Sequence, residues 1–189
     1  MSKIKKTTLL FILLINVFSF QLLAQKTKAK NEQVKSSFTS YEKYIDDNTD
    51  AHLKEFMELV SIPSISSIPA NKPDVDKAAA WIVNKLKAIG MTTAQTIPTD
   101  GNAVVYGSWD KAPGKPIVLI YAHYDVQPVK ESEWDNPPFA PVIKDGKIFG
   151  RGASDDKSGV MITIWAIEAM LKTDGKLPVN IKFLFVDSS

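Results

Sequence analysis

Three stretches of the sequence place apolar residues three or four positions apart, which is the spacing of an amphipathic helix. Their apolar positions are Leu53, Phe56, Met57 and Val60; Val75, Ala79, Ile82, Leu86 and Ile89; and Val160, Met161, Ile164, Ile167 and Leu171. The pattern predicts a first helix with Thr49 or Asp50 as its cap and Pro63 as its stop, and two further helices over 73–89 and about 156–172. Pro73 suits the first turn of the second helix, and Gly90 suits its C-terminal end.

Short runs rich in β-branched and aromatic residues lie between and after these helices. The predicted strands are 103–106, 117–122, 142–144, 147–149 and 179–186. Asp145-Gly146 separates the third and fourth strands, and this pair favours a tight hairpin. The run 117–122 is nearly all apolar, which is typical of a strand buried on both faces. Helices alternating with such strands predict an α/β fold with a layered sheet.

The first 48 residues differ in character from the rest. Residues 1–24 begin with lysines, contain no acid and continue in an uncharged, largely apolar run from Thr7 to Ala24, which is the pattern of a secretory signal peptide. A secreted or periplasmic location is therefore expected, with membrane attachment only if this segment stays uncleaved. Residues 25–48 are polar and lysine-rich, which predicts a flexible leader.

Composition narrows the chemistry that the chain can perform. Its 189 residues include 23 basic and 21 acidic side chains, so nothing in the charge points to a nucleic-acid partner. The chain has no cysteine, which excludes a disulfide scaffold, cysteine-ligated zinc and a thiol nucleophile. His52 and His123 are the only histidines, so a metal or acid–base site must be built from them and from carboxylates.

One candidate site is His123-Tyr124-Asp125, directly after the predicted strand 117–122. Ligands of open α/β sheets bind at the carboxyl ends of strands. Residues two apart in an extended segment point to the same side, so Asp125 can accept a hydrogen bond from one ring nitrogen of His123. The other nitrogen is then available to a metal. A hydrogen-bonded loop histidine without a ligand is the alternative for so short a motif.

A second candidate site is the glycine-containing segment 150–159, between the hairpin and the last helix. Asp155 and Asp156 stand at the predicted helix N-terminus, where the helix dipole favours the ionised carboxylate. Ionised carboxylates bind hard and borderline dications. The alternative is an N-cap followed by an ordinary first turn.

With their surroundings, these segments resemble the M20 family of metal-dependent peptidases, in its dipeptidase and carboxypeptidase branch. The matching segments are Ile62-Pro63-Ser64-Ile65-Ser66, Tyr121 to Pro128, Trp134 to Phe139, Asp145-Gly146-Lys147 and Gly150 to Lys157. The resemblance covers about residues 50–186. It implies that 49–189 are part of the α/β catalytic domain of a zinc peptidase, which hydrolyses peptide bonds with a metal-bound hydroxide and a glutamate base.

The resemblance also implies a site with two zinc ions. By motif position, His123 would ligate one metal, Asp155 would bridge both, and Asp125 would be the supporting catalytic carboxylate. The peptide bond after Asp155 is often cis in this family. A peptide or dipeptide substrate and homodimerisation are implied for the complete enzyme, with N-acyl amino acids as the alternative substrates. His52 matches no ligand of the family.

The sequence departs from the family pattern at two places. Ser158 stands where glycine usually follows the lysine. After the strand 179–186, the family has glutamates that supply the base and the next ligand, whereas this chain reads Asp187-Ser188-Ser189. Two ligands are fewer than a catalytic zinc normally has.

The expectation is therefore an incomplete catalytic domain, without its C-terminal half and the lid and dimerisation domain. Such a truncated chain would bind zinc weakly or partially and would be inactive alone. A non-catalytic binding module and the N-terminal half of a split enzyme are the alternatives.

Overall fold

The computed structural model describes residues 25–32, 34–36 and 38–187. The predicted signal peptide, residues 1–24, and the Ser188-Ser189 end lie outside the described residues. The chain divides into two compact units, 1–43 and 44–189. Among the residues that the structure describes, no helix has both the length and the apolar character needed to cross a bilayer.

Residues 25–48 differ in structure from the flexible leader that the sequence predicts. Their described positions are helical up to Asp47. This segment contains no glycine or proline, and its Lys, Gln, Ala and Glu residues are good helix formers. The hydroxyls of Thr39 and Ser40 donate to the carbonyl oxygens four residues earlier, which is the usual helical arrangement of such side chains. The polar composition from which a flexible leader was predicted is therefore compatible with a helix in this segment.

The second unit is built on a four-stranded mixed sheet. Across the sheet the strands are β1 (Thr93–Ile97), β2 (Val104–Trp109), β6 (Asn180–Val186) and β3 (Ile117–His123). The first three pair antiparallel, whereas β3 and β6 pair parallel. The parallel pair therefore ends at one edge of the sheet, where His123 lies opposite Val186.

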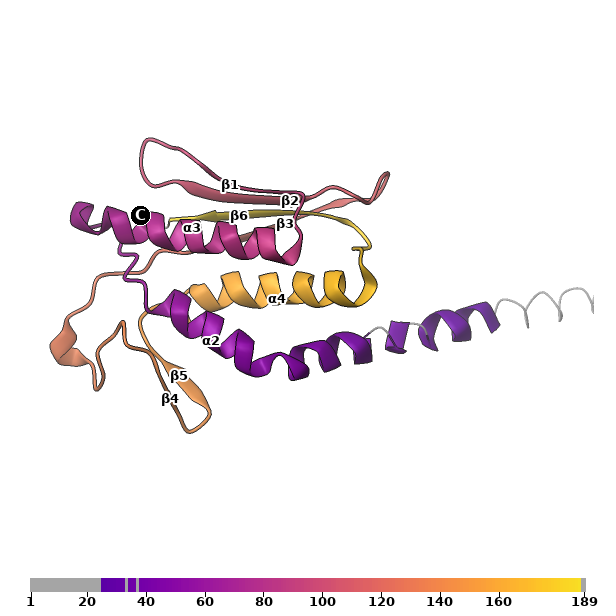
Figure 1. Cartoon of the computed structure of the whole chain (residues 1–189), viewed down its shortest axis with the longest axis horizontal. Coiled ribbons are helices and arrows are strands. Elements are labelled where there is room, and N and C mark those ends of the chain that lie inside the picture. Colours follow the sequence, from indigo (N-terminus) through magenta and orange to yellow (C-terminus); the bar gives the residue numbers. More distant parts are fainter. Residues whose placement is uncertain (1–24, 33, 37, 188–189) are drawn as a thin grey trace, which may run out of the picture. The chain divides into compact units, whose positions relative to one another are not determined.

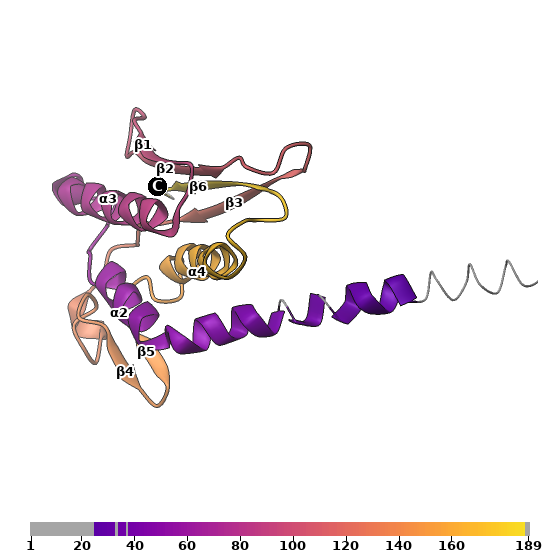
Figure 2. The same ribbon diagram turned by 45° about the vertical axis from the view of Figure 1, so that its right-hand side comes forward.

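Helices α2 (Thr49–Val60), α3 (Lys72–Ile89) and α4 (Lys157–Asp174) lie on one side of this sheet in both ribbon views (Figure 1, Figure 2). Contacts join α3 to β1 and β2, α4 to β3, and α2 to α4. The three helices match the predicted ones to within two residues at each end. The predicted α/β class with a layered sheet is confirmed.

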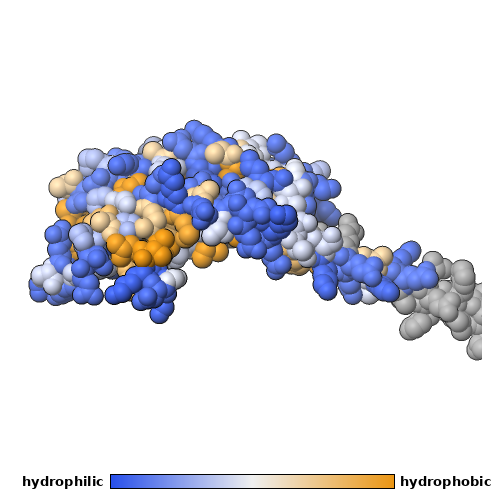
Figure 3. Space-filling model, turned by 60° about the horizontal axis from the view of Figure 1, so that its bottom comes forward, coloured by the Kyte–Doolittle hydropathy of each residue, from blue (hydrophilic) through white to orange (hydrophobic). Residues whose placement is uncertain are grey.

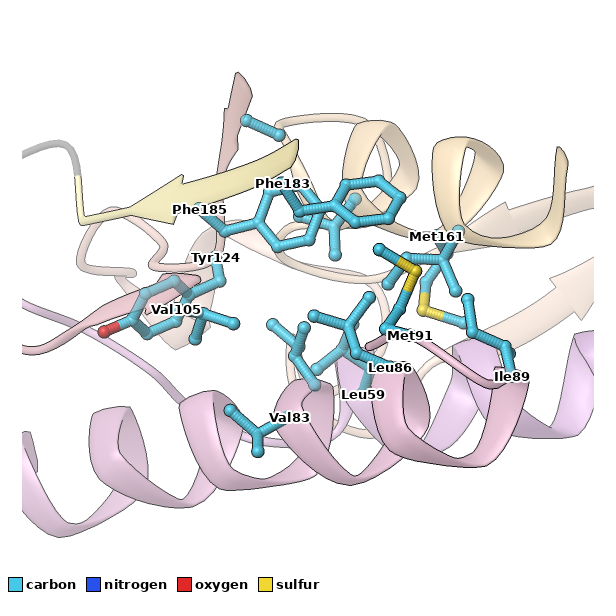
Figure 4. Close-up of a cluster of buried hydrophobic side chains, with 14 of the residues drawn as sticks. Leu59, Val83, Leu86, Ile89, Met91, Val105, Tyr124, Met161, Phe183 and Phe185 are labelled. Atoms are coloured by element: carbon cyan, nitrogen blue, oxygen red, sulfur yellow. The ribbon is translucent and has the colours of Figure 1, made fainter. Parts of the chain in front are cut away.

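The hydrophobic core lies between the sheet and these helices. Alternate residues of β6, namely Ile181, Phe183 and Phe185, are almost completely buried. Figure 4 shows the two phenylalanines in one cluster with Leu86 of α3 and Met161 of α4. Full burial of such a side chain contributes about 1.5–3 kcal/mol, so this layer fixes β6, and through it β3, against the helices.

β3 differs from the expected strand that is buried on both faces. Among the described residues its one paired neighbour is β6, so β3 forms an edge of the sheet. Leu119 and Tyr121 are 59% and 64% exposed, while the inward-facing Ala122 is buried. The apolar run suggested two covered faces, but the described helices cover one face only.

The predicted hairpin is present, with β4 (Val142–Lys144) paired to β5 (Lys147–Phe149). Asp145 and Gly146 have φ of 52° and 71°, the two positive angles that a type I′ turn requires. Two short 3-10 helices, Pro69–Asn71 and Glu131–Glu133, lie in the loops. Figure 3 shows one face of the molecule, on which hydrophobic residues gather within a mainly hydrophilic surface.

Candidate metal centre

His123 ends β3, and its imidazole lies between two carboxylates. Nδ1 is 3.0 Å from Oδ1 of Asp125, and Nε2 is 3.0 Å from Oδ1 of Asp155. Asp155 follows His123 by 32 positions, so the fold brings the two segments singled out in the sequence together at one edge of the sheet. The imidazole is partly exposed, with 22% of its side-chain surface accessible.

Asp125 is fully buried, and the loop after α2 holds its carboxylate from the side opposite the imidazole. The hydroxyl of Ser66 donates to Oδ2 of Asp125 across 2.5 Å. The same loop is tied to the backbone around Asp125. Ser64 Oγ donates to the carbonyl oxygen of Tyr124 at 2.8 Å, and the Val126 N–H donates to the carbonyl oxygen of Ser64 at 2.9 Å.

Asp155 lies in the turn before α4 and, in contrast, exposes 80% of its side chain. The peptide bond between Asp155 and Asp156 is cis, as the family resemblance implies. Asp156 accepts a hydrogen bond from the backbone N–H of His123 at 3.4 Å. Its carboxylate also lies against the first turn of α4, where a Cβ at Gly159 would collide with it.

Lys157 supports this turn from within the core. It is fully buried and donates to the carbonyl oxygens of Leu59, at 3.0 Å, and of Ile62, at 2.6 Å. Burial lowers the pKa of Lys157 to about 7, while the charge of Asp125 acts in the opposite direction. The side chain therefore links the start of α4 to the end of α2.

The pKa of His123 results from opposing effects. Partial burial lowers it, but the hydrogen bonds and charges of Asp155 and Asp125 together outweigh burial and raise the pKa above its usual 6.5. Without a metal, the two carboxylates therefore stabilise the protonated imidazole relative to that of a free histidine. A metal at Nε2 has to displace that proton.

The donor atoms on the exposed side of the ring fit a single zinc ion. Two ligands at zinc–ligand lengths of about 2.0–2.2 Å and a tetrahedral angle lie about 3.3 Å apart. The separation of His123 Nε2 and Asp155 Oδ1 is 3.0 Å. Imidazole and carboxylate are both good ligands for zinc. Asp125 is at the other ring nitrogen, so it can orient the imidazole but cannot bind the same ion.

A second group of potential ligands lies elsewhere, between α2, α3 and α4. Atoms of His52, Glu55 and Glu168 lie within 4.8 Å of one another. The ammonium of Lys85 is 2.8 Å from both glutamates, and the ring of His52 stacks on Trp165 with centroids 4.9 Å apart. Since the ammonium of Lys85 already pairs with both carboxylates, we interpret this cluster as an ion-pair network between the helices.

Ser66 and Lys157 contact the centre but were not predicted as site residues. Ser66 and its partner Asp125 are 59 positions apart, and Lys157 lies 98 positions after Leu59. No local spacing reveals such contacts. The available signal was that both residues belong to segments that carry the family resemblance.

Comparison with known proteins decides the family. Residues 119–188 match the family model "Peptidase family M20/M25/M40". The Cys-Gly metallodipeptidase DUG1 of Candida albicans is 34% identical over 173 residues, covering 79% of this chain and 36% of the relative. The crystal structure of human carnosine dipeptidase 1 matches with a TM-score of 0.71 and 29% identity, covering 79% of this chain and 34% of that one.

This chain belongs to the M20 peptidase family. The family resemblance found in the sequence is confirmed. The M20 chain spans about a third of the length of the curated relatives that it matches. Another of them, the Beta-Ala-His dipeptidase of Rattus norvegicus, is 31% identical over 156 residues and covers 75% of this chain and 31% of the relative.

The predicted secreted or periplasmic location is wrong. The Dug1 Cys-Gly dipeptidases of yeasts, which are among the relatives matched, are cytosolic enzymes. The prediction depended on the charge and apolar pattern of residues 1–24 alone. That pattern is typical of a signal peptide, but by itself it does not fix where the protein is located.

Proposed function

We propose that this chain forms part of the active site of a zinc-dependent dipeptidase. His123 and Asp155 are the proposed metal ligands, with Asp155 bridging two ions, and Asp125 is the supporting carboxylate. The observation that supports this most directly is the imidazole of His123, which has a buried carboxylate at Nδ1 and an exposed one 3.0 Å from Nε2. Membership of the M20 family supplies the reaction class.

Each residue has a distinct task in this proposal. Asp125 accepts the Nδ1 proton of neutral His123 and so keeps Nε2 available as a ligand. Asp155, at the solvent side, offers a carboxylate that substrate and metal can reach. Zinc, when bound, would polarise the scissile carbonyl group and lower the pKa of water.

A dipeptide is the proposed substrate. Two kinds of relatives support it by name, the Cys-Gly metallodipeptidases and the Beta-Ala-His dipeptidases. Both names specify the cleavage of a bond between two amino acids. Neither points to the N-acyl amino acids that were considered as alternative substrates.

We further propose that the 189-residue chain binds zinc weakly and does not turn over substrate alone. Among the described residues, the site offers His123 and Asp155 as ligands for one ion, whereas a catalytic zinc normally has three protein ligands. Homodimerisation of the complete enzyme stays a prediction, which size-exclusion chromatography with light scattering would test.

Zinc binding by paired histidine variants tests the site. The chain has two histidines, one in each potential ligand group, so His123→Asn and His52→Asn are matched. We expect isothermal titration of the purified chain with zinc to show binding that His123→Asn abolishes and His52→Asn leaves within about threefold. Binding lost only in His52→Asn would place the metal in the other cluster and refute the proposed site. Rapid Cys-Gly hydrolysis by the 189-residue chain would refute its inactivity.

A further inference from the structure

We propose that Ser66 is a positioning residue for the metal centre. Its hydroxyl holds the carboxylate of Asp125 in the orientation that presents Oδ1 to Nδ1 of His123, and Nε2 then faces Asp155. This inference rests on the proposed metal-binding function. It extends that function by one residue, from a loop that no ligand motif includes.

The contacts form a continuous chain from the loop to the exposed carboxylate. Ser66 Oγ donates to Asp125 Oδ2 at 2.5 Å, Asp125 Oδ1 lies 3.0 Å from His123 Nδ1, and His123 Nε2 lies 3.0 Å from Asp155 Oδ1. Hydrogen bonds to an ionised acceptor are short and about twice as strong as neutral ones. The Ser66 contact therefore restrains the rotation of the Asp125 carboxyl group.

Burial makes this restraint important. Asp125 is fully buried, so water cannot replace a donor that is removed from its carboxylate. Asp155 is largely exposed, and water competes for its oxygens. The orientation of the imidazole thus depends mainly on the buried Asp125, whose carboxylate Ser66 holds.

The loop itself does not depend on the Ser66 hydroxyl. Ser64 makes two hydrogen bonds to the 124–126 segment, and Lys157 donates to the carbonyl oxygen of Ile62 at the start of the loop. Removing the Ser66 hydroxyl therefore removes the contact with Asp125 and leaves the loop attached. A change in the metal centre of a variant without this hydroxyl can therefore be attributed to Asp125 and not to a detached loop.

The balance of His123 tautomers measures the effect directly. In the neutral ring, Asp125 favours the proton on Nδ1, whereas Asp155 favours it on Nε2. The Nε2–H tautomer cannot bind a metal through Nε2. A less restrained Asp125 shifts the balance toward that tautomer, so metal affinity falls.

Two measurements test the proposal on the purified chain. In the metal-free protein, at a pH well above the pKa of His123, ring ¹⁵N chemical shifts report the tautomer, and His52→Asn identifies the signals of His123. We expect mainly Nδ1–H in the wild type, a clear shift toward Nε2–H in Ser66→Ala, and the wild-type pattern in Ser66→Thr. Chelator competition should show zinc binding about tenfold weaker in Ser66→Ala, in line with the loss of groups that orient metal ligands.

Ser67→Ala is the matched control, because Ser67 is the exposed neighbour of Ser66 in the same loop. It should resemble the wild type in both measurements. If Ser66→Ala unfolds, Ser66→Cys keeps the volume with a weaker donor and should give an intermediate tautomer balance. The proposal is overturned if Ser66→Ala and Ser66→Cys both leave the tautomer balance and the zinc affinity unchanged. It is also overturned if Ser67→Ala changes them as much as Ser66→Ala does. A tautomer shift without zinc binding by the wild type would support Ser66 as positioning residue and refute the proposed metal function.

Discussion

The ammonium of Lys157 donates a hydrogen bond to the carbonyl oxygen of Ile62 across 2.6 Å. It thereby joins the first residue of α4, two positions after the candidate metal ligand Asp155, to the loop that carries Ser66. A second bond from Lys157 reaches Leu59 at the end of α2. One side chain therefore holds the two segments that build opposite sides of the candidate centre.

Replacing this lysine should destabilise the fold. Lys157→Met keeps the apolar stem but removes a charge-assisted hydrogen bond from each of two carbonyl oxygens, which retain only their backbone N–H donors, at a cost of about 1.5–3 kcal/mol for each lost bond. Relief from burying an amine offsets part of this, so we expect a net loss of about 2 kcal/mol, measured by urea unfolding. Lys172→Met, at an exposed position of the same helix, should change stability by less than about 0.5 kcal/mol. Equal effects of the two substitutions would contradict the role of Lys157.

The same lysine predicts a pH dependence of stability. Its pKa is about 7 in the folded chain and 10.5 when exposed, so between these values the unfolded state binds more protons than the native state. The free energy of unfolding contributed by Lys157 therefore rises with pH across this window. We expect the difference in unfolding free energy between wild type and Lys157→Met to grow from about pH 7 to about pH 10. A constant difference would show that the amine titrates normally in the fold.

Gly152 should tolerate no larger residue. Its φ is +84°, and an added Cβ would lie 2.6 Å from Val126 Cγ1, beside the segment that holds Asp125. Gly114 offers a matched control, because its φ is +72° but nothing lies within 4 Å of an added Cβ. Gly114→Ala should cost about 1 kcal/mol for the backbone alone, and Gly152→Ala about 2–4 kcal/mol because overpacking adds to it. Thermal unfolding of both variants measures the difference, and similar losses would mean that the contact with Val126 relaxes freely.

Much of this fold follows from local sequence patterns. The helices α2, α3 and α4 were predicted because apolar spacing, prolines and terminal glycines agree, and the hairpin because Asp145-Gly146 suits two positive φ angles. β1 was missed because Thr93–Ile97 is mostly polar and exposed at the sheet edge, where no apolar alternation is needed. Strand burial was misjudged at β3, because an apolar run does not reveal whether a second layer covers it.

The candidate site shows the same limit of local patterns. The pairing of His123 with Asp125 follows from residues two apart on a strand end, and this geometry is what the structure has. Asp155 was named through family resemblance, and only the parallel pairing of β3 with β6 and the position of α4 bring it to the ring. Ser66 and Lys157 act across loops, so their contacts required the three-dimensional fold.

Zinc binding should release a proton from His123 and weaken as the pH falls. The pKa of this imidazole lies above 6.5 because Asp155 and Asp125 outweigh the effect of burial. Below that pKa, protons compete with zinc at Nε2, so the dissociation constant should rise by up to about tenfold per pH unit. Asp125→Asn removes one of the charges that raise the pKa, so the onset of this weakening should move to lower pH, while affinity at high pH falls by about 10–100-fold through loss of the orienting carboxylate. Titration calorimetry in buffers of different ionisation enthalpy counts the released protons at each pH. Zinc affinity that is independent of pH across the titration of His123 would exclude this imidazole as a ligand.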